Sequence, residues 1–167
     1  TLFSIKKMTE TAQVTFSSLA EKPKTQLKLV NKRLDELSQI AQANQVRSLD
    51  PAIKEFQTSV AQATQDLTDM YLNVTSSDSL IVKEIVAETR KLKENKEKVE
   101  AVLGTKIGDT DQLSSALNRI EEQTAAYLLT DLAQRTLSQA DQVLLTGAIQ
   151  DFEARNYASA LEKIWLL

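Results

Sequence analysis

The sequence of 167 residues contains no cysteine and no histidine. Their absence excludes disulfide bonds, thiol chemistry, the usual zinc and haem ligands, and any catalytic mechanism built on an imidazole. Paired carboxylates such as Glu121 and Glu122 occur, but di-metal sites in helical bundles combine glutamates with a Glu-x-x-His element. We therefore expect neither a metal nor any other cofactor.

Glycine and proline are scarce, with 3 and 2 residues respectively. Average usage is about 7% and 5%, and so few turn residues leave little room for many short strands. Hydrophobic residues make up 42% of the chain, which is enough to form a sizeable core. The composition therefore predicts an all-α protein.

Long apolar runs are also lacking. No stretch approaches the roughly 18 consecutive apolar residues of a membrane span, and no signal peptide is recognisable. The net charge of −3 argues against nucleic-acid binding. Residues 1–33 nevertheless carry seven basic and two acidic residues. This basic stretch is either a solvated helical face or a region that steers a partner or a membrane surface towards the N-terminal end.

Apolar residues at spacings of three and four predict about six helices in three successive antiparallel hairpins. The first two helices cover about residues 2–20 and 24–46. The third starts at Pro51 with Asp50 as its N-cap. The fourth covers about residues 79–103, with Gly104 as its C-cap, and the fifth starts near residue 111, with Thr110 or Asp111 as its cap. Residues 1–103 thus form a four-helix bundle, and residues 111–167 are expected to pack on it as one domain.

The C-terminal hairpin has a tetratricopeptide-like pattern. The small residues Gly147, Ala148 and Ala160 allow two helices to approach closely, while Phe152 and Tyr157 fill the corner beside the turn. A solenoid needs about three such hairpins and this chain has one, so we interpret it as a local packing device.

The middle of the fourth helix is unusually polar, because Leu92 is the only large apolar residue between Glu88 and Lys98. This segment is predicted either to project past the core or to be contacted on one narrow side. Trp165 lies on an apolar stripe that reaches the last residues, so it either packs back on the bundle or marks a continuation. These features predict an interaction surface, whose candidate residues are Arg90, Lys93, Glu94, Glu97 and Trp165.

Two short motifs resemble an uncharacterised bacterial domain family known mainly from candidate-phyla bacteria. Lys6, Lys7 and Glu10 match its first motif, and Arg33, Leu34 and Glu36 match its second. Members of that family typically follow an N-terminal membrane helix, so the resemblance implies an extracytoplasmic, membrane-anchored domain. Because the chain starts at Thr1, we expect that such an anchor preceded it. The resemblance covers about the first 50 residues and implies no activity.

The same motifs predict a charged network between the first two helices. Lys6 and Glu10 are one helical turn apart, and Arg33 and Glu36 lie on the facing helix of the same hairpin. We hypothesise that these four side chains fix the register of the two helices.

The sequence therefore predicts a non-enzymatic helical module that binds a protein partner, with homodimerisation possible and no nucleic-acid partner. An alternative is a sensor bundle that binds a small anion through Arg33, Arg90 or Arg119. A third reading, an enzyme that works through carboxylates and lysines alone, would require buried groups with perturbed pKa values.

Overall fold

The computed structural model describes residues 18–167, and its regular elements there are all helical. The elements are α2 (Lys22–Gln42), α3 (Val46–Tyr71), the 3₁₀ turn η1 (Ser76–Asp78), α4 (Ser79–Leu103), α5 (Asp111–Leu132), α6 (Gln139–Glu153) and α7 (Tyr157–Ile164). The all-α prediction is thus confirmed for the described residues. The helix predicted at residues 2–20 falls almost entirely outside them.

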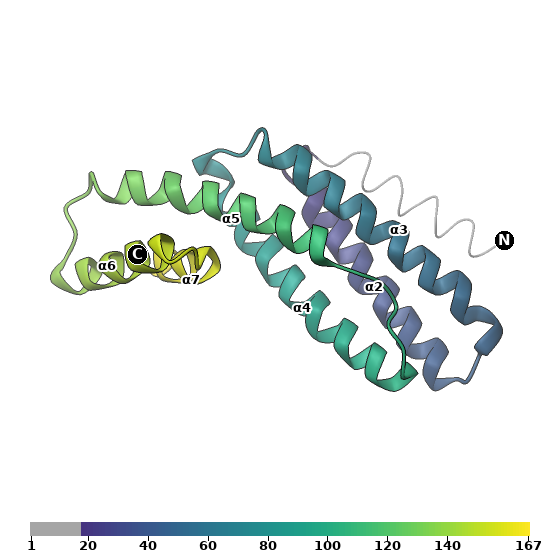
Figure 1. The fold of residues 1–167 in the computed structure, drawn as a ribbon. Coiled ribbons are helices and arrows are strands. Elements are labelled where there is room, and N and C mark those ends of the chain that lie inside the picture. The colour runs from purple at the N-terminus through teal and green to yellow at the C-terminus, as the bar shows by residue number, and fades with distance from the viewer. Residues whose placement is uncertain (1–17) are drawn as a thin grey trace.

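Helix α2 lies between α3 and α4 (Figure 1) and packs along both of them. Leu27, Val30, Leu34 and Leu37 recur every three or four residues, and all four are fully buried. Successive hairpins would pair α4 with α3, but α4 packs mainly along α2. The reason is the connection through residues 72–78, where η1 and its capping box at Thr75 redirect the chain.

Helix α3 begins at Val46, so the predicted start at Pro51 is wrong. Pro51 lies inside the helix, and the N-cap is Gln45 instead of Asp50. The turn is made by Asn44, whose φ of 57° supplies the left-handed conformation that usually falls to glycine. Since this turn closes directly after α2, α3 begins before the proline. Pro51 lacks a backbone N–H, so α3 loses one hydrogen bond near its N-terminal end.

The connection between α4 and α5 is packed into the core. Gly104 has a φ of 66° and caps α4, as predicted. Ile107 is fully buried; its carbonyl accepts a hydrogen bond from Gln57 Nε2 at 2.9 Å, and its amide donates to Glu100 Oε1 at 3.0 Å. This segment therefore ties α5 to the bundle.

Thr110 is the N-cap residue of α5, the first of the two caps that the sequence offered. The Thr110 side chain makes no capping hydrogen bond. The amide of Asp111 instead donates to Asp109 Oδ1 at 2.8 Å. An aspartate often bonds a backbone amide two residues further on, so Asp109 satisfies the first amide of α5 in place of the N-cap side chain.

Helix α5 joins the bundle to the C-terminal hairpin (Figure 1) and packs against α3 and α7. Buried apolar side chains from the bundle, α5 and both helices of the hairpin form one continuous cluster. In the hairpin, Ala148 and Ala160 are fully buried, and the rings of Phe152 and Tyr157 lie 5.3 Å apart. Small residues and an aromatic corner thus bring α6 and α7 together in the way the sequence predicted.

Candidate interaction surface

The candidate site residues occupy two separate regions of the described structure. Arg33 and Glu36 line a groove between α2 and α3. Arg90 and Lys93 lie on α4, near its contacts with α5 and α7. Lys6 and Glu10 fall outside the described residues, so the four-member network stays a prediction.

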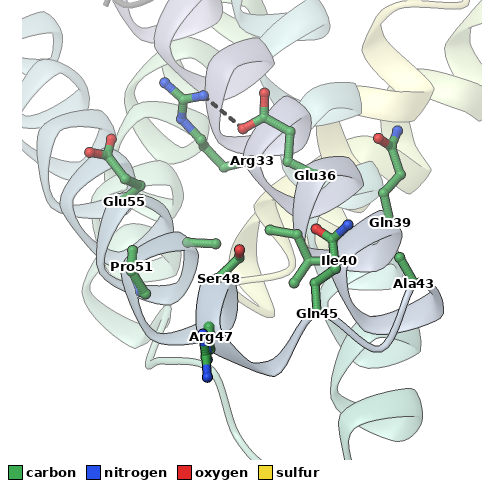
Figure 2. Close-up of a pocket in the computed structure, with 11 residues that line it drawn as sticks. Arg33, Glu36, Gln39, Ile40, Ala43, Gln45, Arg47, Ser48, Pro51 and Glu55 are labelled. Carbon is green, nitrogen blue, oxygen red and sulfur yellow. Dashed lines mark hydrogen bonds and ion pairs between the residues drawn. The ribbon is translucent and has the colours of Figure 1, made fainter. Parts of the chain in front are cut away.

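The groove lies between the C-terminal half of α2 and the beginning of α3, and its cavity volume is about 690 Å³. Figure 2 shows the lining residues: Arg33, Glu36, Gln39, Ile40, Ala43, Gln45, Arg47, Ser48, Pro51 and Glu55, with Ala52 beside them. Its walls combine aliphatic carbons with amides, a hydroxyl and charges of both signs.

Arg33 is buried in this groove although it carries a charge, with only 5% of its surface exposed. Its Nη1 donates to Glu36 Oε2 at 2.8 Å (Figure 2), so the two residues pair as the second motif requires. A buried charge of this kind is stable only when it is paired and hydrogen-bonded. The pair is electrically neutral, which weighs against an anion site built on Arg33.

The polar segment of α4 was predicted either to project past the core or to be contacted on one narrow side. The structure shows contact, because this segment has buried residues. Thr89 and Leu92 are buried, whereas Lys93, Glu94 and Glu97 are exposed. Asn31 Nδ2 of α2 donates to the carbonyl oxygen and to Oε2 of Glu88, at 3.1 and 2.9 Å.

Trp165 packs back on the bundle. Its Nε1 donates to Ser79 Oγ at 3.0 Å, and Lys83 Nζ lies 5.6 Å from the ring centroid. Ser79 and Glu94 are 15 residues apart on one helix, which corresponds to roughly 20 Å. The five candidate surface residues therefore do not form a single patch.

Arg90 also holds α7 against α4, because its Nη2 pairs with Glu162 Oε1. Both side chains of this pair are more than half exposed. Glu162 lies 72 residues away in sequence, so no local pattern indicated the pairing.

Sequence reasoning also missed the role of Glu121, which it had considered only as a metal ligand. Glu121 is buried, with 6% of its surface exposed. Burial raises its pKa to about 7; Lys93 and Arg90 act to lower the pKa, and Glu162 raises it further. The available signal was its spacing, since Glu121 follows Leu117 by four residues and precedes Thr124 by three on the apolar stripe.

The third candidate arginine, Arg119, lines a smaller cleft of about 340 Å³ between α3 and α5. Asp111 lines the same cleft, together with the hydroxyl groups of Thr64, Thr68 and Tyr71. Two of the three arginines proposed to bind an anion, Arg33 and Arg90, are thus paired with an acidic residue.

Comparisons with protein-family models, with curated proteins and with solved structures gave no match to this chain. Within residues 18–167, no group of three or more acidic side chains is placed to hold a metal ion. None of the described helices offers a segment with the length and hydrophobicity of a membrane span.

Proposed function

We propose that the chain is a non-enzymatic helical module that binds a protein partner through the outward face of α4. The observation that carries this proposal is the exposure of two aliphatic side chains on that face, Leu80 at 73% and Val102 at 63%. They are 22 residues apart, about six helical turns, so both lie on nearly the same side of α4. Between them the face carries charges of both signs, including Lys91, Glu94 and Lys98.

The chemistry of this face favours a protein segment with alternating charges over a nucleic acid or a uniformly charged surface. Exposed ion pairs contribute about 0 to 1 kcal/mol each, so they set orientation and association rate more than affinity. The two aliphatic side chains would provide the apolar contacts at either end of the partner segment. The partner is expected to lie outside the cytoplasmic membrane, an inference that rests on the family resemblance of the first 50 residues.

The first test is the molar mass in solution, measured by light scattering behind a sizing column over a wide concentration range and at low and high salt. The matched variants are Leu80→Glu with Val102→Glu, and Leu72→Glu as a control, because Leu72 is 75% exposed at the end of α3. A dimer that the double variant loses and the control keeps would identify the partner as a second copy of this chain.

A monomer under all conditions would require a different partner, which a photocrosslinker at position 91 can capture from an extracytoplasmic extract. Binding of the captured protein should be lost in the double variant and retained in Leu72→Glu. The opposite pattern would contradict the assignment to α4.

The groove between α2 and α3 is the feature that favours the alternative, a small-molecule sensor. A volume of about 690 Å³ lies within the range of ligand pockets. Sulfate, phosphate and acetate are suitable probes, since a sensor for a small anion would show concentration-dependent thermal stabilisation that Arg47→Ala removes. The neutral pairing of Arg33 with Glu36 leads us to expect no stabilisation.

A further inference from the structure

The pair of helices α2 and α3 has an outer edge, on the side opposite to α4 and α5. In the part of the chain that the structure describes, α2 packs along α3 and α4, and α3 packs along α2 and α5. Asn31 of α2 bonds to α4, whereas Arg33 lies about 200° further around the helix and lines the groove. On α3, Gln57 bonds to Ile107 in the connection to α5, and Glu55 lies in the groove on the other side. The groove therefore belongs to this outer edge.

The outer edge is buried although it carries polar side chains. Gln26 lies two turns before Arg33 on α2, and Ser59 and Asp66 lie about one and three turns after Glu55 on α3, so all of them face this edge. Gln26, Arg33, Ser59 and Asp66 expose only 4% to 7% of their surface. Polar residues at the margin of a helix pair are mostly exposed. Such burial is what a third helix lying along the edge would produce.

We propose that the outer edge, with its groove of about 690 Å³, is the docking site of residues 2–17 of this chain. The segment lies outside the described residues, and its sequence carries apolar side chains at spacings of three and four, which predict an amphipathic helix. These side chains are Ile5, Met8, Ala12 and Phe16. The inference does not depend on the proposed function, which concerns the face of α4.

The length and direction of the chain bring this segment to the groove. The carbonyl of Ser18 accepts hydrogen bonds from the amides of Glu21 and Lys22, so the chain turns directly before α2. In helical form, residues 2–17 span about 24 Å, and the groove begins at Arg33, about 16 Å along α2 from Lys22. A segment antiparallel to α2 therefore covers the outer edge and ends beside the groove.

The charges at this level of the groove complement those of the segment. The antiparallel register places Lys6 near Glu36 and Glu10 near Arg33, so each charge comes to lie beside one of opposite sign. Between these charges, the groove presents aliphatic carbons, among them Ala52, to the apolar stripe of the segment. A docked segment would leave no room for a free small anion, in agreement with the absence of stabilisation that we expect from sulfate and phosphate.

Because the chain contains no cysteine, a pair of introduced cysteines tests the docking in the full chain. Ile5→Cys with Ala52→Cys places one thiol on the apolar stripe and the other in the groove. The matched control is Ile5→Cys with Lys54→Cys, because Lys54 is exposed and lies about 200° around α3 from Ala52. With a short bismaleimide crosslinker, the groove pair should react within one chain at least about tenfold faster than the control pair, since docking raises the effective concentration of that pair alone.

Three results of this experiment would overturn the proposal. Equal rates for the two pairs would mean that the segment is an undocked tether. Crosslinked dimers would assign the groove to the segment of a second copy, and the absence of any crosslink would place the segment elsewhere. Circular dichroism under reducing conditions verifies that the cysteine variants fold.

A second measurement requires no cysteines. Met8→Glu puts a charge on the apolar stripe and should lower the urea concentration at the midpoint of unfolding. Gln13→Glu introduces the same charge away from the stripe and should leave the midpoint unchanged. A Met8→Glu variant with the midpoint of the wild type would contradict the docking of this segment.

Discussion

Two buried glutamates near α4 have opposite properties, although both are more than nine-tenths buried. Glu100, beside the connection to α5, accepts hydrogen bonds from Lys106 Nζ and the amide of Ile107, and its Oε1 lies 2.8 Å from Lys96 Nζ. Burial alone would raise its pKa, but these donors outweigh burial and lower the pKa to about 2. Glu121 has no such donors, and burial raises its pKa to about 7.

The difference shows that hydrogen-bond donors, more than depth, decide whether a buried acid stabilises this fold. Glu100 fixes the connection that carries Ile107 into the core. Glu121 lies at the junction with the C-terminal hairpin, where burial disfavours its charged form. Helix α6 of that hairpin buries only Ala148 and leaves Val143 70% exposed, so this end of the molecule is expected to be the less stable one.

The largest effect is expected from Glu100→Gln. An amide cannot satisfy two ammonium groups and a backbone N–H, so the variant should lose about 2 to 4 kcal/mol of unfolding free energy at pH 7. Urea denaturation measures this loss, and Glu97→Gln on the exposed face of α4 is the control. Because the folded pKa lies below the usual value, the contribution of Glu100 is present above pH 4.5 and lost as the pH falls towards 2. A variant as stable as the wild type at pH 7 would contradict this account.

Glu121→Gln should raise the free energy of unfolding, whereas Glu100→Gln lowers it. The folded pKa of about 7 lies above the usual value of 4.5, so the favourable contribution of Glu121 exists below pH 4.5 and is lost as the pH rises through 7. Through this group the wild type should be about 2 to 3 kcal/mol less stable at pH 8 than at pH 5. Urea titrations at both pH values should show the variant gaining stability over the wild type only at pH 8. An equal difference at both values would mean that ionisation is not involved.

Arg33→Ala extends the comparison to a buried cation. The substitution leaves Glu36, which is 24% exposed, without the bond from Arg33, and should cost about 1 to 3 kcal/mol. A double-mutant cycle of Arg33→Ala with Glu36→Gln separates the interaction energy of the pair from the energy lost with the packing of the Arg33 side chain. Adding Lys6→Gln and Glu10→Gln to the cycle tests the four-member network. A cost within about 0.5 kcal/mol would mean that the pair of Arg33 with Glu36 contributes little to the stability of the fold.

Local features of the fold were predictable because they depend on neighbours in sequence. The periodicity of Leu27, Val30, Leu34 and Leu37 predicted the buried face of α2, and Gly104 predicted the end of α4. The early start of α3 was missed, because an asparagine in the left-handed region leaves almost no sequence signal.

The site was less predictable, because its pairs join residues that are far apart in sequence. Arg33 and Glu36 are three residues apart and could be proposed as partners from the sequence alone. Arg90 was expected to face a binding partner, but its partner is Glu162 on α7. Only the packing of α5 and α7 beside α4 brings these charges and Glu121 together.

The smallest effect is expected from Glu162→Gln. Both members of its pair with Arg90 are more than half exposed, so solvent screening should limit the loss of global stability to less than about 1 kcal/mol. Hydrogen exchange should nevertheless quicken in α7 and not in α2, because the pair fixes a contact that the global core does not need. Asp131→Asn, which removes an equally exposed pair with Arg135 inside one segment, is the matched control. If both variants leave exchange in α7 unchanged, the contact with α4 is held by Trp165, through Ser79 and Lys83, and does not need the pair of Arg90 with Glu162. The contrast between Glu100 and Glu121 would then not extend to the hairpin.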